Sequence, residues 1–279
     1  MVKHSFILIL TLLLSACSSA RLSYGFLDTW LQWRIDDYVS LSAEQQTFAN
    51  QQLKEFHRWH RQTQLEEYSD FIERTVVLIR QENISTEELD THLNQVTALW
   101  DASIEYLLPF SVALLQQLDE SQKEDLLNNI KTQQAKERDE NSQLSIEQQQ
   151  QERLDKTEKR FKQWLGSINT AQQNILSEWA RSIQVMANAR DQRQLVWNQR
   201  FNELLVKSDN DFDIKAARLL FMDAEQLWPK SYTERFDQNK TLLLNMIVDV
   251  HQQMDSTQKQ FLIRRLQNYQ ADFMYLAAR

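Results

Sequence analysis

Cys17 is the only cysteine in the 279 residues, and its surroundings favour one kind of chemistry. A basic start at Lys3 leads into an apolar run over residues 6–14 and then into a Leu-Ser-Ala-Cys sequence that ends at Cys17. A run this short does not cross a bilayer as a helix, which needs about 20 residues, but it suits the core of a signal peptide. Small residues before a cysteine fit a signal peptidase. We therefore expect residues 1–16 to be removed and Cys17 to become the new amino terminus.

The same segment resembles the bacterial lipobox, whose cysteine receives a diacylglyceryl group by thioether. The resemblance implies a mature chain, residues 17–279, that is held on the bilayer by lipid such as palmitate on Cys17. Several acyl chains make such anchoring stable, because each buried methylene contributes about 0.8 kcal/mol. In similar lipoproteins a residue other than aspartate after the cysteine, here Ser18, implies the outer membrane, facing the periplasm. The alternatives are an ordinary secretory signal with an incidental cysteine and the helical start of a cytosolic protein.

His57 and His60 are the residues whose spacing suits a metal ion, since positions three apart place two imidazoles on one helix face. Arg58 and Arg61 flank them and oppose a cation, and no third ligand stands at a useful local spacing. We therefore expect no metal. The other interpretation is that Trp59 and His60 pack on a neighbouring helix while the arginines pair with carboxylates. Trp59, His60 and Arg61 are then candidates for binding a partner.

Motifs of the common catalytic classes do not occur in the sequence. It has no Gly-x-Ser-x-Gly elbow, no glycine-rich phosphate loop and no His-Glu-x-x-His. The single cysteine excludes an intrachain disulfide and a C-x-x-C site. The carboxylates are numerous but mixed with basic residues, so no catalytic pair stands out. We expect a non-enzymatic protein without a cofactor. The alternatives are an envelope hydrolase or metal-binding enzyme, and a structural assembly subunit.

The composition predicts helices and an acidic surface. Only 2 Gly and 2 Pro occur, where average usage gives roughly 20 and about 14. Because these two residue types form the tight turns that a sheet needs, their scarcity argues against strands. The formal net charge of −8 repels nucleic-acid phosphates, so we expect no nucleic-acid partner.

A repeated capping pattern marks where the helices begin. A Ser, Asp or Asn side chain caps the helix, and a Gln or Glu three residues later reaches back to the cap amide. The pairs are Ser42/Gln45, Ser85/Glu88, Asp119/Gln122, Ser145/Gln148, Asn169/Gln172, Ser231/Glu234 and Asp255/Gln258. We expect seven or eight capped helices in one elongated or cradle-like all-α bundle with no sheet.

Four further features bear on this arrangement. Pro109 should kink or end the helix that starts near residue 86, and Pro229 should end the one that starts near 214. The polar segment 207–213 is a candidate hinge within the domain 17–279. Residues 120–165 are so polar that they predict a protruding hairpin or a solvated helix face.

The sequence has eight tryptophans, a high number for its length. They are Trp30, Trp33, Trp59, Trp100, Trp164, Trp179, Trp197 and Trp228. The favoured interpretation is that they fill the core between helices. One alternative is that several line a groove for apolar or unfolded partners. Another is that Trp30 and Trp33, close to the lipid, lie among the head groups.

Two resemblances to known families rest on these motifs. The segments Leu41-Ser-Ala-Glu-Gln45, Leu118-Asp-Glu-Ser-Gln122 and Met254-Asp-Ser-Thr-Gln258 are similar to the Leu-Thr-x-x-Gln motif of Spy/CpxP-type periplasmic stress chaperones. A second set of motifs resembles an uncharacterised gammaproteobacterial lipoprotein family of unknown function. That set comprises Tyr24-x-x-Leu27-x-x-Trp30, Asp37-Tyr38, Leu41, Gln45, Trp59-His60-Arg61, Trp164-Leu165-Gly166, Asn169 and Gln172.

The second resemblance extends from the lipobox to about residue 206 and implies a helical fold and an envelope location, without a reaction. Together with the absence of catalytic motifs, it leads us to expect a protein-binding or chaperone-like lipoprotein. Its expected partners are the bilayer, through acylated Cys17, and unidentified envelope proteins.

Overall fold

The computed structural model describes residues 19–142, 144–206 and 213–279. This part of the chain forms eleven helices, ten of them of at least seven residues, and no strand, when the unbroken run through α4, η1 and α5 is taken as one helix. The expected all-α class is confirmed. There are more helices than the seven or eight expected, because several of them start without a capping box. Cys17, Ser18 and residues 207–212 of the candidate hinge lie outside the described residues.

The helices follow one another with short connections. The elements run in the order α2 (Ser19–Tyr24), α3 (Leu27–Asp36), α4 (Ala43–Trp59), the π-helical turn η1 (His60–Gln64), α5 (Leu65–Arg80), α6 (Thr86–Gln116), α7 (Glu120–Ser142), α8 (Ile146–Leu165), α9 (Thr170–Ser182), α10 (Ala187–Val206), α11 (Ile214–Phe221), the 3₁₀ turn η2 (Ala224–Leu227), α12 (Lys230–Gln252) and α13 (Ser256–Ala277).

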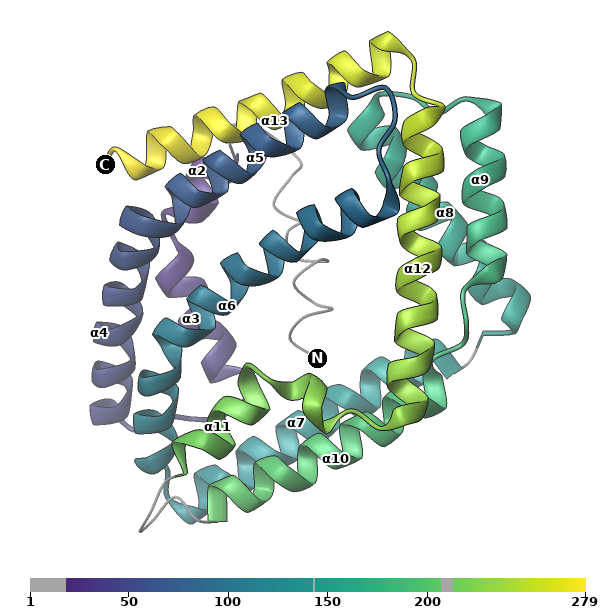
Figure 1. The fold of residues 1–279 in the computed structure, drawn as a ribbon. Coiled ribbons are helices and arrows are strands. Elements are labelled where there is room, and N and C mark those ends of the chain that lie inside the picture. The colour runs from purple at the N-terminus through teal and green to yellow at the C-terminus, as the bar shows by residue number, and fades with distance from the viewer. Residues whose placement is uncertain (1–18, 143, 207–212) are drawn as a thin grey trace.

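The helices form the sides of an open, four-sided frame (Figure 1). α5 lies beside α13 on one side, and α7 lies beside α10 on the opposite side. The other two sides are formed by α4 with α3, and by α12 with α8 and α9. Helix α6 crosses the inside and contacts α4, α5, α11 and α12.

Six of the seven predicted capping boxes form. They are the boxes that begin at Ser42, Ser85, Asp119, Ser145, Asn169 and Asp255. The Ser231 box is wrong: α12 already begins at Lys230, with Pro229 as its N-cap, so Ser231 is the second residue of the helix and cannot cap it. Its hydroxyl lies instead 3.0 Å from the Gln192 side-chain oxygen.

The glutamines of two boxes far apart in the sequence pair with each other. Gln45 Nε2 donates to Gln122 Oε1 at 2.9 Å, and Gln122 Nε2 donates to Gln45 Oε1 at 2.7 Å. Each amide also donates to a backbone carbonyl of the other loop, from Gln45 to Gln117 at 2.6 Å and from Gln122 to Ser40 at 2.8 Å. The paired boxes thus join the starts of α4 and α7.

A second pair repeats this bonding pattern between α9 and α13. Gln172 and Gln258 exchange two amide bonds of 2.9 Å. Gln172 also donates to the carbonyl of Gln253, and Gln258 donates to that of Ser167. In both pairs the accepting carbonyl lies five positions before the partner glutamine, so the two paired boxes have the same geometry.

The two halves of the chain also repeat the same helix contacts. α3 packs on α4 as α8 packs on α9, and α4 contacts α6 as α9 contacts α12. Helix α5 of the first half lies along α13 of the second, and α10 of the second half lies along α7 of the first. The frame is therefore built from two halves with similar helix contacts, in which α5 of the first half packs on the second half and α10 of the second half packs on the first.

The buried apolar residues form four clusters rather than one central core. The largest joins α6, α7, α10 and α11 around Leu108, Leu126, Phe201 and Leu220. Because this cluster includes residues on both sides of the segment 207–212, α10 and α11 pack against a common core. The other clusters centre on Leu89 with Leu244, on Leu176 with Val250, and on Ile72 with Tyr269.

The long helix α6 contains Pro109 and does not end there. It bends along its length instead (Figure 1), as expected where a proline removes a backbone donor. Among the described residues, α6 is the one helix long and apolar enough, by length and composition alone, to cross a membrane. It lies inside the frame against four other helices, and its Glu105 pairs with Arg218 at 2.6 Å.

The polar region 120–165 consists mainly of α7 and α8. α7 lies along α10, where the amides of Gln134 and Asn198 exchange hydrogen bonds of 3.0 and 2.8 Å. Gln134 is buried in this contact. The first half of the region is therefore one side of the frame rather than a protruding hairpin.

The tryptophans divide into two groups. Six of the eight are partly buried, as the core-filling interpretation predicts. Trp197, for example, stacks on Phe201 with ring centroids 4.9 Å apart. Trp30 and Trp33 differ, because their exposed fractions are 42% and 63%.

Candidate functional site

The histidine pair predicted from the sequence lies where α4 passes into α5 through η1 (His60–Gln64). In Figure 1 this passage is the corner between the α4 side and the α5 side of the frame. A π-helical turn places an extra residue in a helix and frequently marks a functional position. The corner is therefore the first place to look for a site.

His60 is the centre of a buried hydrogen-bond chain. Its Nδ1 lies 2.9 Å from the hydroxyl of Tyr24, and its Nε2 lies 3.0 Å from that of Tyr68. Burial raises the pKa of Tyr68 to about 12, and the nearby Ser103 hydroxyl on α6 acts in the opposite direction. Burial, with a smaller contribution from the nearby His57, lowers the pKa of His60 to about 4. His60 is thus neutral, with one ring nitrogen donating and the other accepting.

His57 belongs to a second, more polar set of contacts. Its Nδ1 lies 3.5 Å from a carboxylate oxygen of Asp28, and its Nε2 lies 3.4 Å from Nη2 of Arg61. Burial and then the Arg61 charge lower the pKa of His57, and Asp28 acts in the opposite direction. The ring of Tyr24 lies between the two networks, with its centroid 4.9 Å from that of His57 and 5.8 Å from that of His60.

This arrangement does not present two free imidazoles to a metal ion. Both ring nitrogens of His60 are engaged by tyrosine hydroxyls. Within residues 19–142, 144–206 and 213–279, no group of three or more His, Cys, Asp and Glu side chains is placed to hold a metal. At this corner both histidines are engaged by protein side chains and are not arranged as free metal ligands.

Trp59 and Arg61 lie at the edge of this corner, partly exposed. Trp59 stacks on Tyr106 of α6, with ring centroids 4.3 Å apart and planes at 18°. Tyr106 has an exposed fraction of 38%. The Arg61 guanidinium lies 5.8 Å above the ring of Tyr24. Of the three residues predicted from the sequence to bind a partner, His60 is therefore buried, while Trp59 and Arg61 are partly exposed and contact different neighbours, Tyr106 and Tyr24.

Sequence reasoning missed their supporting residues. Tyr24 and Asp28 are one helical turn apart, a spacing that could have placed them on one face. Nothing local indicates that this face meets His57 and His60. Tyr68 and Tyr106 belong to apolar helical patterns that predict core residues, and their hydroxyls carry no separate signal.

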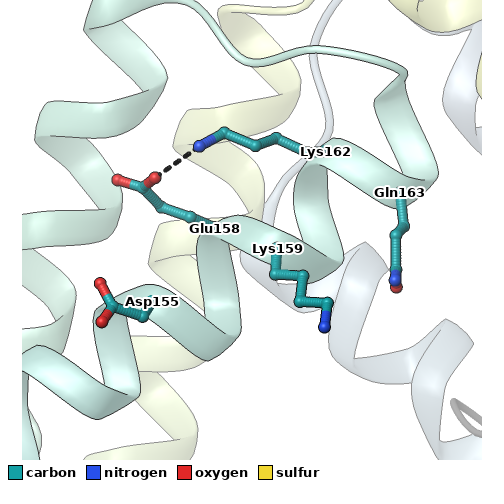
Figure 2. A pocket seen from close by; sticks show the side chains of 5 residues that line it. All are labelled: Asp155, Glu158, Lys159, Lys162 and Gln163. Carbon is teal, nitrogen blue, oxygen red and sulfur yellow. Dashed lines mark hydrogen bonds and ion pairs between the residues drawn. The ribbon is translucent and has the colours of Figure 1, made fainter.

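The pockets in the described part of the molecule are shallow. One of about 540 Å³ runs along α8 and is lined by five polar residues of that helix alone (Figure 2). Glu158 and Lys162 in it pair with each other at 2.8 Å. A second, of about 390 Å³, lies between α5 and α6 and includes Arg74 and His92. Neither has the enclosed form of a small-molecule site.

The fold and the site define an all-α protein in which each half of the chain contains one pair of joined capping boxes. The chain belongs to a family of unknown function, DUF6279, whose profile matches residues 37–233. This range covers the α4–α5 corner and begins after α3. None of the curated proteins and none of the solved structures matches the chain. The lipobox and the likeness to Spy/CpxP-type chaperones stay predictions.

Proposed function

We propose that the protein is a lipoprotein of the outer membrane, facing the periplasm, that binds other proteins in a chaperone-like manner and catalyses no reaction. The observation that carries the proposal is the stacked pair of Trp59 and Tyr106 at the α4–α5 corner, with Arg61 two residues after Trp59 in the chain. Trp, Tyr and Arg are the residue types that dominate protein-binding hot spots. Here they are partly exposed, and two of them are held by ring stacking.

The buried network beneath them supports this role. Tyr24 and Tyr68 hold His60, which follows Trp59 directly, on both ring nitrogens. Side chains fixed before binding lose less conformational entropy when a partner arrives. Shallow surfaces without an enclosed pocket also suit protein contacts better than a small substrate.

The binding activity is tested with the purified, lipid-bearing protein in detergent micelles. We expect it to slow the aggregation of a reduced, unfolded client at stoichiometric ratio. Tyr106→Ser should raise the amount needed for half-maximal protection about threefold or more, because it removes an exposed ring from the group.

Leu195→Ser is the matched control, because Leu195 is 69% exposed on the distant helix α10. It should leave protection unchanged. A wild-type protein that fails to slow aggregation contradicts the proposed function. An equal loss of protection in Tyr106→Ser and Leu195→Ser contradicts the assignment of client binding to the α4–α5 corner.

The anchor is tested by growing cells with radiolabelled palmitate. We expect the label on the wild-type chain and in the outer-membrane fraction, and its complete loss in Cys17→Ser, because the thiol is the acceptor in the lipobox chemistry. Arg58→Ser, an exposed change in the body, is the control. Wild-type protein that carries no label, or that fractionates as a free periplasmic protein, contradicts the proposal.

A further inference from the structure

Four large apolar side chains near the start of the described chain are exposed. Phe26, Trp30 and Trp33 follow at spacings of four and three residues, which places them on one face of α3. Leu22 of α2 stands four residues before Phe26. Their exposed fractions are 68% for Leu22, 63% for Phe26, 42% for Trp30 and 63% for Trp33. We call these four residues the aromatic stripe.

The opposite face of α3 is fixed to the protein. Asp28 pairs with His57 of α4, and Ile35 packs against the largest core cluster. Since α3 has one face attached in this way, the stripe has no room to turn inward without breaking these contacts. Its exposure is a property of the packed structure.

Helix α2 is fixed to the opposite end of the chain. Nε of Arg21 lies 2.5 Å from a carboxylate oxygen of the buried Asp272 on α13. The Arg21 guanidinium also lies 4.1 Å above the ring of Tyr275. The aromatic stripe is thus held in a set orientation on the frame.

The position of the stripe in the sequence points to what covers it. Cys17 stands two positions before Ser19, the first residue of α2. Two residues of chain reach at most about 7 Å. If Cys17 carries lipid, α2 therefore lies at the membrane surface, and Leu22 is less than one further helical turn away. No long linker separates the anchor from the folded body.

We propose that the aromatic stripe lies in the head-group layer of the same membrane that holds the lipid of Cys17. Tryptophan is enriched at that level, because its ring is apolar and its indole N–H can stay hydrated. An apolar helix face and acyl chains together act as two membrane signals. The inference rests on the proposed lipid anchor and goes beyond it, because it sets the orientation of the frame on the membrane.

The charges around the stripe indicate which lipids are needed. Arg21 and Arg34 are balanced by Asp28 and Asp36 in the same two helices and by Asp37, which follows α3 directly. With no excess of basic residues, attraction to anionic lipid contributes little. Contact with a zwitterionic surface is therefore sufficient, and it should be insensitive to salt.

The test uses nitroxide labels on the lipid-bearing protein in phosphatidylcholine vesicles. The only native cysteine is blocked by its lipid, so a cysteine introduced by Phe26→Cys or Trp33→Cys carries the label alone. We expect collisions with oxygen to be favoured over those with a water-soluble nickel chelate severalfold at both positions, compared with Leu195→Cys. Leu195 is equally exposed, at 69%, but lies on α10.

The possible outcomes separate the stripe from the anchor. The labels at 26 and 33 could show the same collision preference as the label at 195, while the protein still floats with the vesicles. That result overturns the proposed membrane contact of the aromatic stripe and leaves the proposed lipid anchor intact. Labels protected from both oxygen and the nickel chelate indicate that a second copy or another protein covers the aromatic stripe. This result also overturns the proposed membrane contact. Protein that does not float overturns both proposals.

A second measurement uses the wild-type protein and so does not depend on the folding of any variant. In wild-type protein, Trp30 and Trp33 are the most exposed of the eight tryptophans, and the other six are partly buried. Lipids brominated near the head group should quench part of the tryptophan fluorescence, and lipids brominated at the chain end should quench less. No quenching by either lipid overturns the proposal.

Discussion

Lowering the pH from 7 to 4 is expected to reduce the free energy of unfolding by roughly 3 kcal/mol through His60 alone. The folded-state pKa of His60 is about 4, because the ring is buried, whereas an unfolded histidine titrates near 6.5. A depressed pKa means that the unfolded state binds the proton first. The contribution of neutral His60 is therefore complete above pH 6.5 and is lost as the pH falls through 4.

Other histidines act in the same direction. Burial is the largest cause of a lowered pKa for His57, His92 and His251 as well. Two charged groups contact His57: Arg61 opposes its protonation, and Asp28 favours it. The groups that face His60 itself, Tyr24 and Tyr68, have pKa values raised by burial and stay neutral over this range.

Urea denaturation at a series of pH values between 7 and 4, followed by circular dichroism, measures the effect. His60→Gln is the comparison, because an amide can both donate and accept hydrogen bonds but does not titrate. We expect this variant to be less stable than wild type at pH 7 and its stability to fall less between pH 6.5 and 4, by about the 3 kcal/mol assigned to His60. Identical pH dependence in the two proteins would show that His60 is not held neutral.

The starts of the helices could be predicted from the sequence because a capping box is local. Ser42 and Gln45 need only the correct spacing to satisfy each other. The pairing of Gln45 with Gln122 could not be predicted in the same way, because each box is already complete within its own helix. The Ser231 box failed for a local reason: Pro229 starts the helix earlier.

The candidate site was predictable to a similar extent. The spacing of His57 and His60 correctly placed them together on one helical segment. Their hydrogen-bond partners come from α2, α3 and α5, and the π-helical turn between α4 and α5 has no sequence signal that we can name. The proximity of Trp59 to Tyr106 depends on how α4 packs against α6.

Gln172→Ala is expected to lower the free energy of unfolding by about 2–4 kcal/mol. Gln172 has no exposed surface. Its removal deletes the cap contact to Asn169 and the two bonds exchanged with Gln258. It also leaves the carbonyl of Gln253 without that amide donor. Buried polar groups that lose their partners account for most of the cost.

Gln148→Ala is the matched control. Gln148 occupies the same position in the Ser145 capping box, but it is exposed and has no partner glutamine. The loss of an exposed capping contact costs about 1 kcal/mol or less. Urea denaturation of both variants at pH 7 therefore separates the effect of pairing from that of capping. Equal losses would mean that the pairing of two boxes adds nothing to the fold.

A double-mutant cycle then isolates the pair itself. Gln172→Ala and Gln258→Ala together should cost less than the sum of the single changes by about 1–2 kcal/mol, because the second change no longer breaks the shared bonds. The Gln45–Gln122 pair should show a smaller coupling, since Gln122 is only partly buried and water can replace its partner. Strict additivity in the Gln172–Gln258 cycle would contradict the view that the paired boxes hold the starts of α9 and α13 together.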